Sequence, residues 1–273
     1  MREEFLNFKQ YYREAMREVS EDSFYRYSID HKFKHSVEVL HIGQTILHHT
    51  PELKNVSDEF MRLAETALLF HDVGRFSEAV KQYEAQKENV VITAASDTFD
   101  HGLLGYEILK HNSQYCDERI LFAVKWHGKM MSKIMSSADW KKAQKSADFE
   151  DIKQILFLVR DADKLANLHH IKADNHLQKD LFFRQLSSEA LNAPISPLVL
   201  KQFYENHSVL FADVYSFADR ILYVLAWAYD LNYQTTKDIF KRQGYVAYLL
   251  DLLAQYHSNA KDVLKIKKVL AKT

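Results

Sequence analysis

The chain has only one cysteine, Cys116, in 273 residues. It therefore cannot form an internal disulfide, and it offers no cluster of thiolates for a structural zinc ion. A bound metal would need nitrogen and oxygen ligands. Proline and glycine are also scarce, with 3 and 6 residues, and apolar residues recur at helical spacing along almost the whole chain. The sequence therefore predicts an all-α protein.

Long hydrophobic runs and an excess of one charge are lacking too. The longest run, ILYVLAWAY at 221–229, has about half the length that crosses a bilayer, and residues 1–16 carry charges throughout. We therefore expect no signal peptide and no transmembrane helix, and we place the protein in the cytoplasm. Because 36 Lys and Arg residues nearly balance 37 Asp and Glu residues, neither a nucleic acid polymer nor a membrane is an expected partner.

The length and the 47% hydrophobic content allow a substantial core. Two polar stretches, 82–99 and 128–148, are longer than the usual connections between helices. They are predicted to be loops of the kind that forms lids or binding sites. The stretch SSEALNAPISP at 187–197 is the best candidate boundary. We expect a histidine-rich helical domain over residues 1–187 and a helical extension packed on it over residues 188–273. The expected helices cover residues 3–19, 34–48, 58–71, 101–112, 117–128, 150–170, 177–187, 197–230, 235–256 and 259–270.

Histidine is the residue type that stands out, with 14 copies. His71 ends a seam formed by Phe60, Ala64 and Ala67, which are spaced by three and four residues, so it faces inward. The same test places three further histidines on apolar helix faces: His35, His101 and His127.

Two aspartates accompany these histidines. Asp72 directly follows His71. In the segment RDADKL, Asp161 shares its helix face with Phe157 and Leu165, whereas Asp163 lies on a more polar face. We therefore select Asp161 as the second buried carboxylate.

A single histidine on an apolar face is more often a structural residue than a ligand. Four histidines and two aspartates at core-facing positions on five separate helices are together poorly explained as structural residues. Each buried carboxylate costs several kcal/mol unless it is paired or binds a cation, and no lysine or arginine shares these apolar faces. One or two metal ions would stabilise all six groups, and imidazole with carboxylate ligands suits Mn, Fe, Co, Ni or Zn.

Five segments in order carry a resemblance. KFKHSVEV, LLFHDVGRF, DHGLLGYEIL, VKWHGK and LVRDADKLANL resemble the successive motifs of the HD superfamily of metal-dependent phosphohydrolases. The resemblance spans about residues 28–168. It implies a helical bundle of the HD-domain type, here with additional C-terminal helices.

The resemblance also implies a ligand set. His35, His71, Asp72 and Asp161 would bind the first metal ion, and His101 and His127 would hold a second ion, with Asp72 as the bridge. The expected cofactor is therefore a divalent transition metal, with two ions. Many two-metal members have a second histidine after the fourth one, where this chain has Gly128.

Three well-marked subgroups do not fit. The segment WHGKMMS lacks the Gly-Tyr-Pro motif of the enzymes that degrade cyclic dinucleotides. The stretch after the His-Asp pair reads VGRFSE, without the Glu-Asp pair of the alarmone hydrolases, and Arg75 stands where the small deoxynucleotidases have glutamate. The subgroup is therefore not identified.

The predicted activity is hydrolysis of a phosphate ester of a nucleotide or another small phosphorylated metabolite. Asp72, Arg75 and Lys164 are the predicted catalytic residues, the two cations as phosphate ligands; a surface ion pair for Arg75 and a snorkelling side chain for Lys164 are the alternatives. Two other readings stay open: a mixed-valence di-iron oxygenase similar to inositol oxygenase, and a catalytically silent metal-binding module. The aromatic C-terminal helices are expected to form core or a homodimer interface.

Overall fold

The computed structural model describes residues 1–88, 100–174, 186–257 and 259–271. These residues form α-helices and short 3-10 helices with no strand among them, which confirms the all-α prediction. None of the described helices is both long and apolar enough to cross a bilayer.

The chain divides into two compact units, Met1–Ala166 and Asn167–Thr273. The division falls inside helix α9 (Phe149–Asp174), ahead of the boundary predicted after residue 187. The predicted helix over 177–187 lies mostly outside the described residues, which resume at residue 186.

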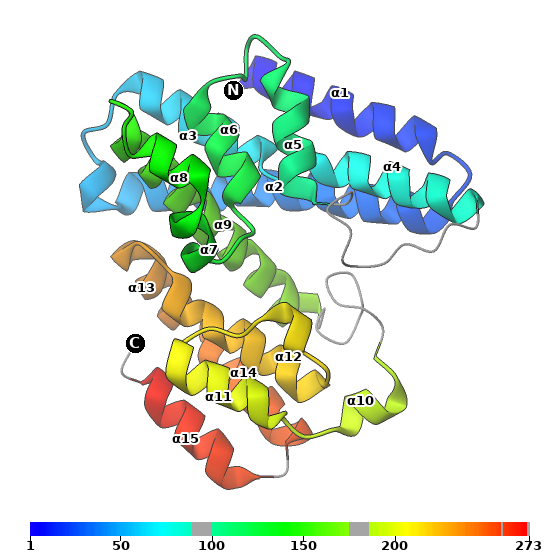
Figure 1. Cartoon of the computed structure of the whole chain (residues 1–273), viewed down its shortest axis with the longest axis vertical. Coiled ribbons are helices and arrows are strands. Elements are labelled where there is room, and N and C mark those ends of the chain that lie inside the picture. Colours follow the sequence, from blue (N-terminus) through cyan, green and yellow to red (C-terminus); the bar gives the residue numbers. More distant parts are fainter. Residues whose placement is uncertain (89–99, 175–185, 258, 272–273) are drawn as a thin grey trace. The chain divides into compact units, whose positions relative to one another are not determined.

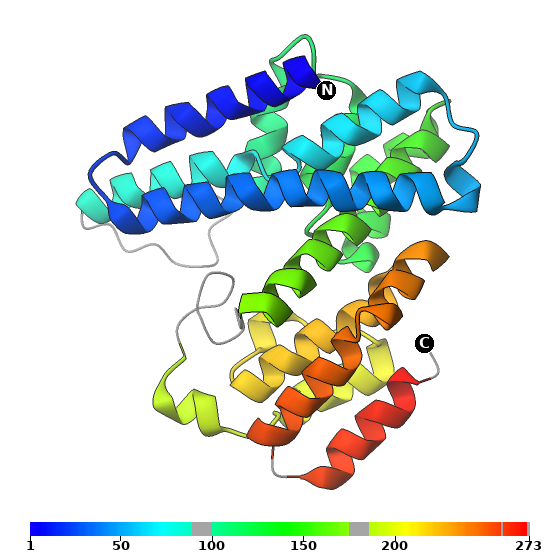
Figure 2. The same ribbon diagram turned by 180° about the vertical axis from the view of Figure 1, so that it is seen from behind.

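Helices of the first unit lie side by side around a shared core (Figures 1 and 2). Helix α2 is the longest and contacts α1, α3 and α4, while α5 packs between α4 and α6. Side chains start several of these helices by accepting backbone N–H bonds: Asp22 caps α2, Ser57 caps α3 and Asp117 caps α6. The helices of this unit up to α8 are α1 (Arg2–Glu18), α2 (Ser23–His49), η1 (Pro51–Leu53), α3 (Asp58–Phe70), α4 (Gly74–Lys87), α5 (His101–Lys110), α6 (Glu118–Trp126), α7 (Met131–Ser136) and α8 (Ala138–Ala143).

Both predicted long loops contain helical structure. Helix α4 begins at Gly74, two residues after Asp72, and runs to residue 87, while residues 89–99 of the first stretch lie outside the described residues. The stretch 128–148 contains α7 and α8. The latter stretch is polar in composition, but Ile134 and Trp140 pack with Phe122 and Ile152 in a small core cluster. These apolar contacts pack the two short helices against α6 and α9.

The second unit contains the predicted C-terminal helices in shorter pieces. The expected helix over 197–230 is interrupted after His207, which has a left-handed backbone with φ of 52°. The expected helix over 235–256 is broken at Gly244, which has φ of 66°. Phe203 is fully buried, whereas Phe211 and Tyr215 are about half exposed, and a homodimer through these helices stays a prediction. The helices of this unit are α10 (Ser188–Asn192), α11 (Pro197–Asn206), η3 (Phe211–Asp213), α12 (Phe217–Leu225), η4 (Ala226–Asp230), α13 (Gln234–Arg242), α14 (Tyr245–Tyr256) and α15 (Ala260–Leu270).

Candidate metal centre

Five helices of the first unit bring histidine and aspartate side chains together. His35 lies in the middle of α2, whereas His71 and Asp72 occupy the short connection between α3 and α4. His101 is the first residue of α5, and His127 directly follows α6. Four of the five residues therefore stand at helix ends, where separate helices converge on one place.

The first group consists of His35, His71 and Asp163, with one oxygen of Asp72 beside them. The Nε2 atom of His35 lies 3.0 Å from Oδ1 of Asp163, and Nε2 of His71 lies 3.8 Å from the same oxygen. The Oδ2 atom of Asp72 is 3.7 Å from Nε2 of His71 and 4.0 Å from Nε2 of His35. The ligand atoms of His35, His71 and Asp163 are close enough to one another to hold one metal ion, and so are those of His71, Asp72 and His127.

The second group consists of His101, His127 and the other oxygen of Asp72. The Oδ1 atom of Asp72 lies 3.5 Å from Nε2 of each of these two histidines. The two Nε2 atoms are 3.2 Å apart. Asp72 therefore presents one oxygen to each group, which is the geometry of a bridging carboxylate.

Asp163, and not the predicted Asp161, is the α9 aspartate of this centre. Asp163 lies beside His35 and His71, while Asp161 is fully buried and belongs to neither group of ligand atoms among the described residues. The two positions differ by about 200° around the helix, so they cannot face the same site. The apolar face of α9 packs in the hydrophobic core, and Asp161 lies there. The ligand cluster is polar, and the more polar face of α9, which carries Asp163, is turned towards it.

The hydrogen bonds of the buried histidines leave their Nε2 atoms suited to bind a cation. The Nδ1 atoms of His71 and His127 lie 2.8 Å and 2.9 Å from the carbonyl oxygens of Leu68 and Val124. A carbonyl only accepts, so each Nδ1 carries a proton, and in the neutral ring this leaves the lone pair on Nε2, the atom that faces the cluster. The Nε2 atom of His71 is buried and makes no hydrogen bond to any described residue. A metal ion would satisfy this lone pair and those of the close pair formed by His101 and His127.

The environment sets the protonation states that a metal requires. Burial lowers the pKa of His71 to about 4, and burial together with the nearby Arg75 lowers the pKa of His101 well below its usual value. Burial alone would raise the pKa of Asp72, but Lys32 and His71 outweigh it and hold that pKa well below its usual range. Near neutral pH the imidazoles of His71 and His101 are therefore neutral and the carboxylate of Asp72 is ionised, which is the ligand state for divalent metals.

Two cations lie against Asp72. The Nζ atom of Lys32 is 3.0 Å from Oδ2, and Nε of Arg75 is 3.7 Å from Oδ1. Arg75 also pairs with Glu78 at 2.7 Å and keeps about a third of its side chain exposed. The expectation that no lysine or arginine shares the faces of these ligands is therefore wrong for Lys32, which lies one helical turn before His35 on the same side of α2 and was not among the predicted residues.

Lys164, which was predicted to bind phosphate, is not one of the cations that lie against Asp72. It is buried, and its Nζ atom lies 3.5 Å from the carbonyl oxygen of Arg160, one turn earlier in α9. A role for Lys164 in phosphate binding stays a prediction.

Buried contacts hold the second group in place. The guanidinium of Arg160, which is 2% exposed, donates to the carbonyl oxygens of His127, at 2.7 Å, and of Lys129. Lys129 in turn pairs with Asp100, the residue that caps α5 directly before His101. Arg160 and Lys129 thus connect the backbone after α6 with the first turn of α5.

Glycines allow the close approach of these helices. A Cβ atom at Gly74 would lie 2.0 Å from the carbonyl oxygen of His101, so α4 can meet α5 only without a side chain at this position. Gly128 is less confined, because its Cβ would lie 3.5 Å from Nε2 of His101. A histidine at Gly128, as in many two-metal members of the family that the sequence resembles, would therefore start beside the second group.

Comparison with known proteins gives one match. Residues 33–168 match the family model of the HD domain. This segment includes every residue of both groups. Among curated proteins and solved structures, no significant match to the chain was found.

Proposed function

The chain belongs to the HD superfamily of metal-dependent hydrolases, and on this basis we propose that it is a phosphohydrolase that cleaves a phosphate ester of a nucleotide or another small phosphorylated metabolite. The observation that carries the proposal is the position of Asp72, whose two oxygens face two groups of nitrogen ligands while Lys32 and Arg75 stand beside it. An anion that approaches this carboxylate would meet both cations.

We propose a centre of two divalent ions. His35, His71 and Asp163 would hold the first ion, His101 and His127 the second, and Asp72 both. Bound ions of this kind supply Lewis acidity and a water molecule that ionises near neutral pH. Nitrogen and oxygen ligands without sulfur suit Mn, Fe, Co, Ni or Zn.

The protein's own task is to bind the phosphate and to compensate the charge that develops on its oxygens. Arg75 suits the first part, because a guanidinium can bind phosphate through two parallel hydrogen bonds and this one is partly exposed. Lys32 suits the second part, because it is largely buried, with 12% of its side chain exposed, and its charge acts in surroundings of low dielectric.

The experiment is phosphate release from a panel of mononucleotides, dinucleoside polyphosphates, cyclic nucleotides and sugar phosphates. The protein is loaded with Mn²⁺ or with Fe²⁺, and Asp72→Ala serves as the inactive control. A matched control is Asp58→Ala, which changes an exposed aspartate in the first turn of α3.

Release that disappears in Asp72→Ala and persists in Asp58→Ala supports the proposal and identifies the substrate class. Failure of every substrate with two ions bound per chain contradicts it. An oxygen-dependent colour change of the iron-loaded protein would then indicate the di-iron oxygenase, and its absence the silent module.

A further inference from the structure

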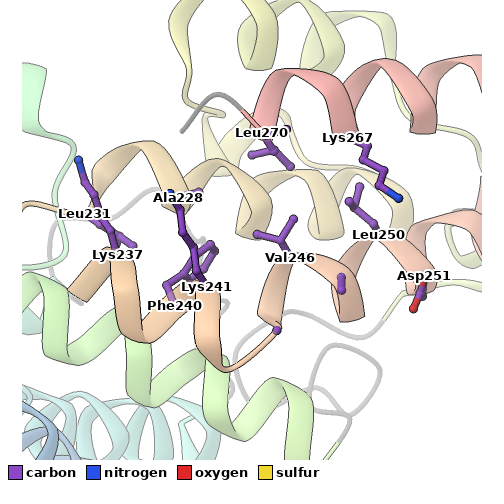
Figure 3. A pocket seen from close by; sticks show the side chains of 13 residues that line it. Ala228, Leu231, Lys237, Phe240, Lys241, Val246, Leu250, Asp251, Lys267 and Leu270 are labelled. Carbon is purple, nitrogen blue, oxygen red and sulfur yellow. The ribbon is translucent and has the colours of Figure 1, made fainter. Parts of the chain in front are cut away.

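The second unit contains a pocket of about 400 Å³ that is unrelated to the HD-type ligands (Figure 3). Helices α13, α14 and α15 and the 3-10 helix η4 surround it. Figure 3 shows Val246, Leu250 and Leu270 turned towards one another from α14 and α15. The apolar wall consists of Ala228, Leu231, Phe240, Val246, Ala247, Leu250, Leu270 and Ala271.

Most of this wall is firmly part of the structure. Leu231, Phe240, Leu250 and Leu270 line the pocket and are all less than 9% exposed, so most of each side chain packs in the core. The volume lies in the range of pockets that take small molecules, and such pockets are mainly apolar with a few polar groups that fix orientation.

The charged residues of the pocket are unbalanced. Lys237 and Lys241 extend from α13 and Lys267 from α15, against the single carboxylate of Asp251. Three positive charges and one negative charge leave an excess of two positive charges. Within the described part of the chain, none of these four side chains takes part in a hydrogen bond or an ion pair, so the lysines are available to a ligand.

We propose that this pocket binds an amphipathic anion, namely an unbranched aliphatic chain that ends in a carboxylate or a phosphate. The aliphatic wall would bury the chain, and each buried methylene group should tighten binding about fourfold. The lysines can lay their own methylene stems along the same wall and keep their ammonium groups at its rim, with Lys237 and Lys267 at opposite ends of the pocket (Figure 3). Their excess positive charge would attract the anionic end of the ligand to this rim. A nucleoside fits less well, because the wall offers few polar partners for a base or a sugar.

The test is calorimetric titration of the full chain with decanoate and with decyl phosphate, each below the concentration at which it aggregates. Decanol and decyltrimethylammonium are the neutral and cationic counterparts. We expect saturable binding of one anion per chain, at least about tenfold tighter than binding of either counterpart, and weakened by added salt. A preference between the two anions would distinguish a fatty acid from a phosphate ester.

Variants connect the binding to this pocket. Lys241→Gln and Lys267→Gln should each weaken anion binding about two- to fivefold. Lys268→Gln is the matched control, because Lys268 is exposed on the same helix and is not part of the pocket. Ala247→Trp should abolish binding by filling the pocket from an exposed helix position, and circular dichroism checks that each variant is folded.

Four results would overturn the proposal. These are no binding of either anion, equal binding of decanol, equal effects of Lys267→Gln and Lys268→Gln, and unchanged binding by folded Ala247→Trp. Gel filtration adds a fifth: a dimer that Ala247→Trp dissociates, without anion binding by the wild type, would make this face an interface between two copies of the chain.

Discussion

Neutralising one or the other aspartate of α9 separates the two possible ligand sets. Asp163→Asn keeps the shape of the side chain but removes its charge beside His35 and His71. Asp161→Asn makes the same chemical change at a fully buried position on the opposite side of the helix.

The structure sets different magnitudes for these two changes. Loss of an outer partner of a metal ligand typically costs 10- to 100-fold in affinity, so loss of a direct anionic ligand should cost at least about 100-fold, or about 2.7 kcal/mol. Asp161 lies across a helix about 10 Å wide and can act on the ion only through the long-range field, so we expect less than about a tenfold change.

The assay is competition for Mn²⁺ or Zn²⁺ against a chelator of known affinity, with metal content measured after gel filtration. Because Asp161→Asn changes a buried group, urea denaturation must show that each variant is folded before affinities are compared. The assignment of Asp163 would be refuted if folded Asp163→Asn kept its metal while folded Asp161→Asn lost it.

Three further predictions concern the same unit. Lys32→Gln should keep the bound metal but lower kcat/KM about 100-fold, because a charge that stabilises the reacting phosphate is lost; steady-state kinetics at saturating metal measure this, and an unchanged kcat/KM speaks against the role. The metal-free protein should lose stability as the pH falls from 6.5 towards 4: the pKa of His71 is about 4 in the folded state, so the unfolded chain takes up this proton first. The loss should approach 3 kcal/mol at pH 4, at about 1.4 kcal/mol per pH unit, and denaturation curves at pH 7, 5.5 and 4.5 that coincide would contradict it. Gly74→Ala should destabilise the fold by about 1–3 kcal/mol, because its Cβ would meet the backbone of His101, whereas Gly128→Ala should have little effect; thermal unfolding compares the two, and equal melting temperatures would disprove the close contact.

Helical periodicity was sufficient to predict the fold class and to find His35, His71 and His127, because a polar residue on an apolar seam must lie inside. The same periodicity was misleading for α9. This helix buries two faces, one with Asp161 in the core and one that is turned towards the candidate metal centre. In such a helix the apolar face indicates only where the core lies. Arg160, one turn before Asp163 on the polar face, is buried and donates to the backbone of His127, so this face points inward too. The sequence does not indicate this, because arginine is a mostly exposed residue type.

Other features depend on contacts between residues that are far apart in the sequence, and no local sequence pattern predicts such contacts. Lys32 lies among charged residues at the start of a motif, and only the approach of α2 to the connection after α3 places its ammonium 3.0 Å from Asp72. Helices α7 and α8 were missed because their anchors, Ile134 and Trp140, are separated by polar residues and find their partners on α6 and α9. The break at His207 requires a left-handed backbone in a residue that is not glycine, which sequence alone rarely indicates.

The shared carboxylate of Asp72 has a consequence for how the centre would fill. Each oxygen faces a different group of imidazoles, 3.5–4.0 Å from the nearest nitrogens. An ion bound at one group would polarise the carboxylate of Asp72 and fix its side-chain torsion angle. Both effects would change the affinity of the other group for its ion. Thermodynamic linkage makes that influence mutual and equal in both directions. Two ions at this centre would not titrate as independent events, and the half-loaded protein would be a species with properties of its own.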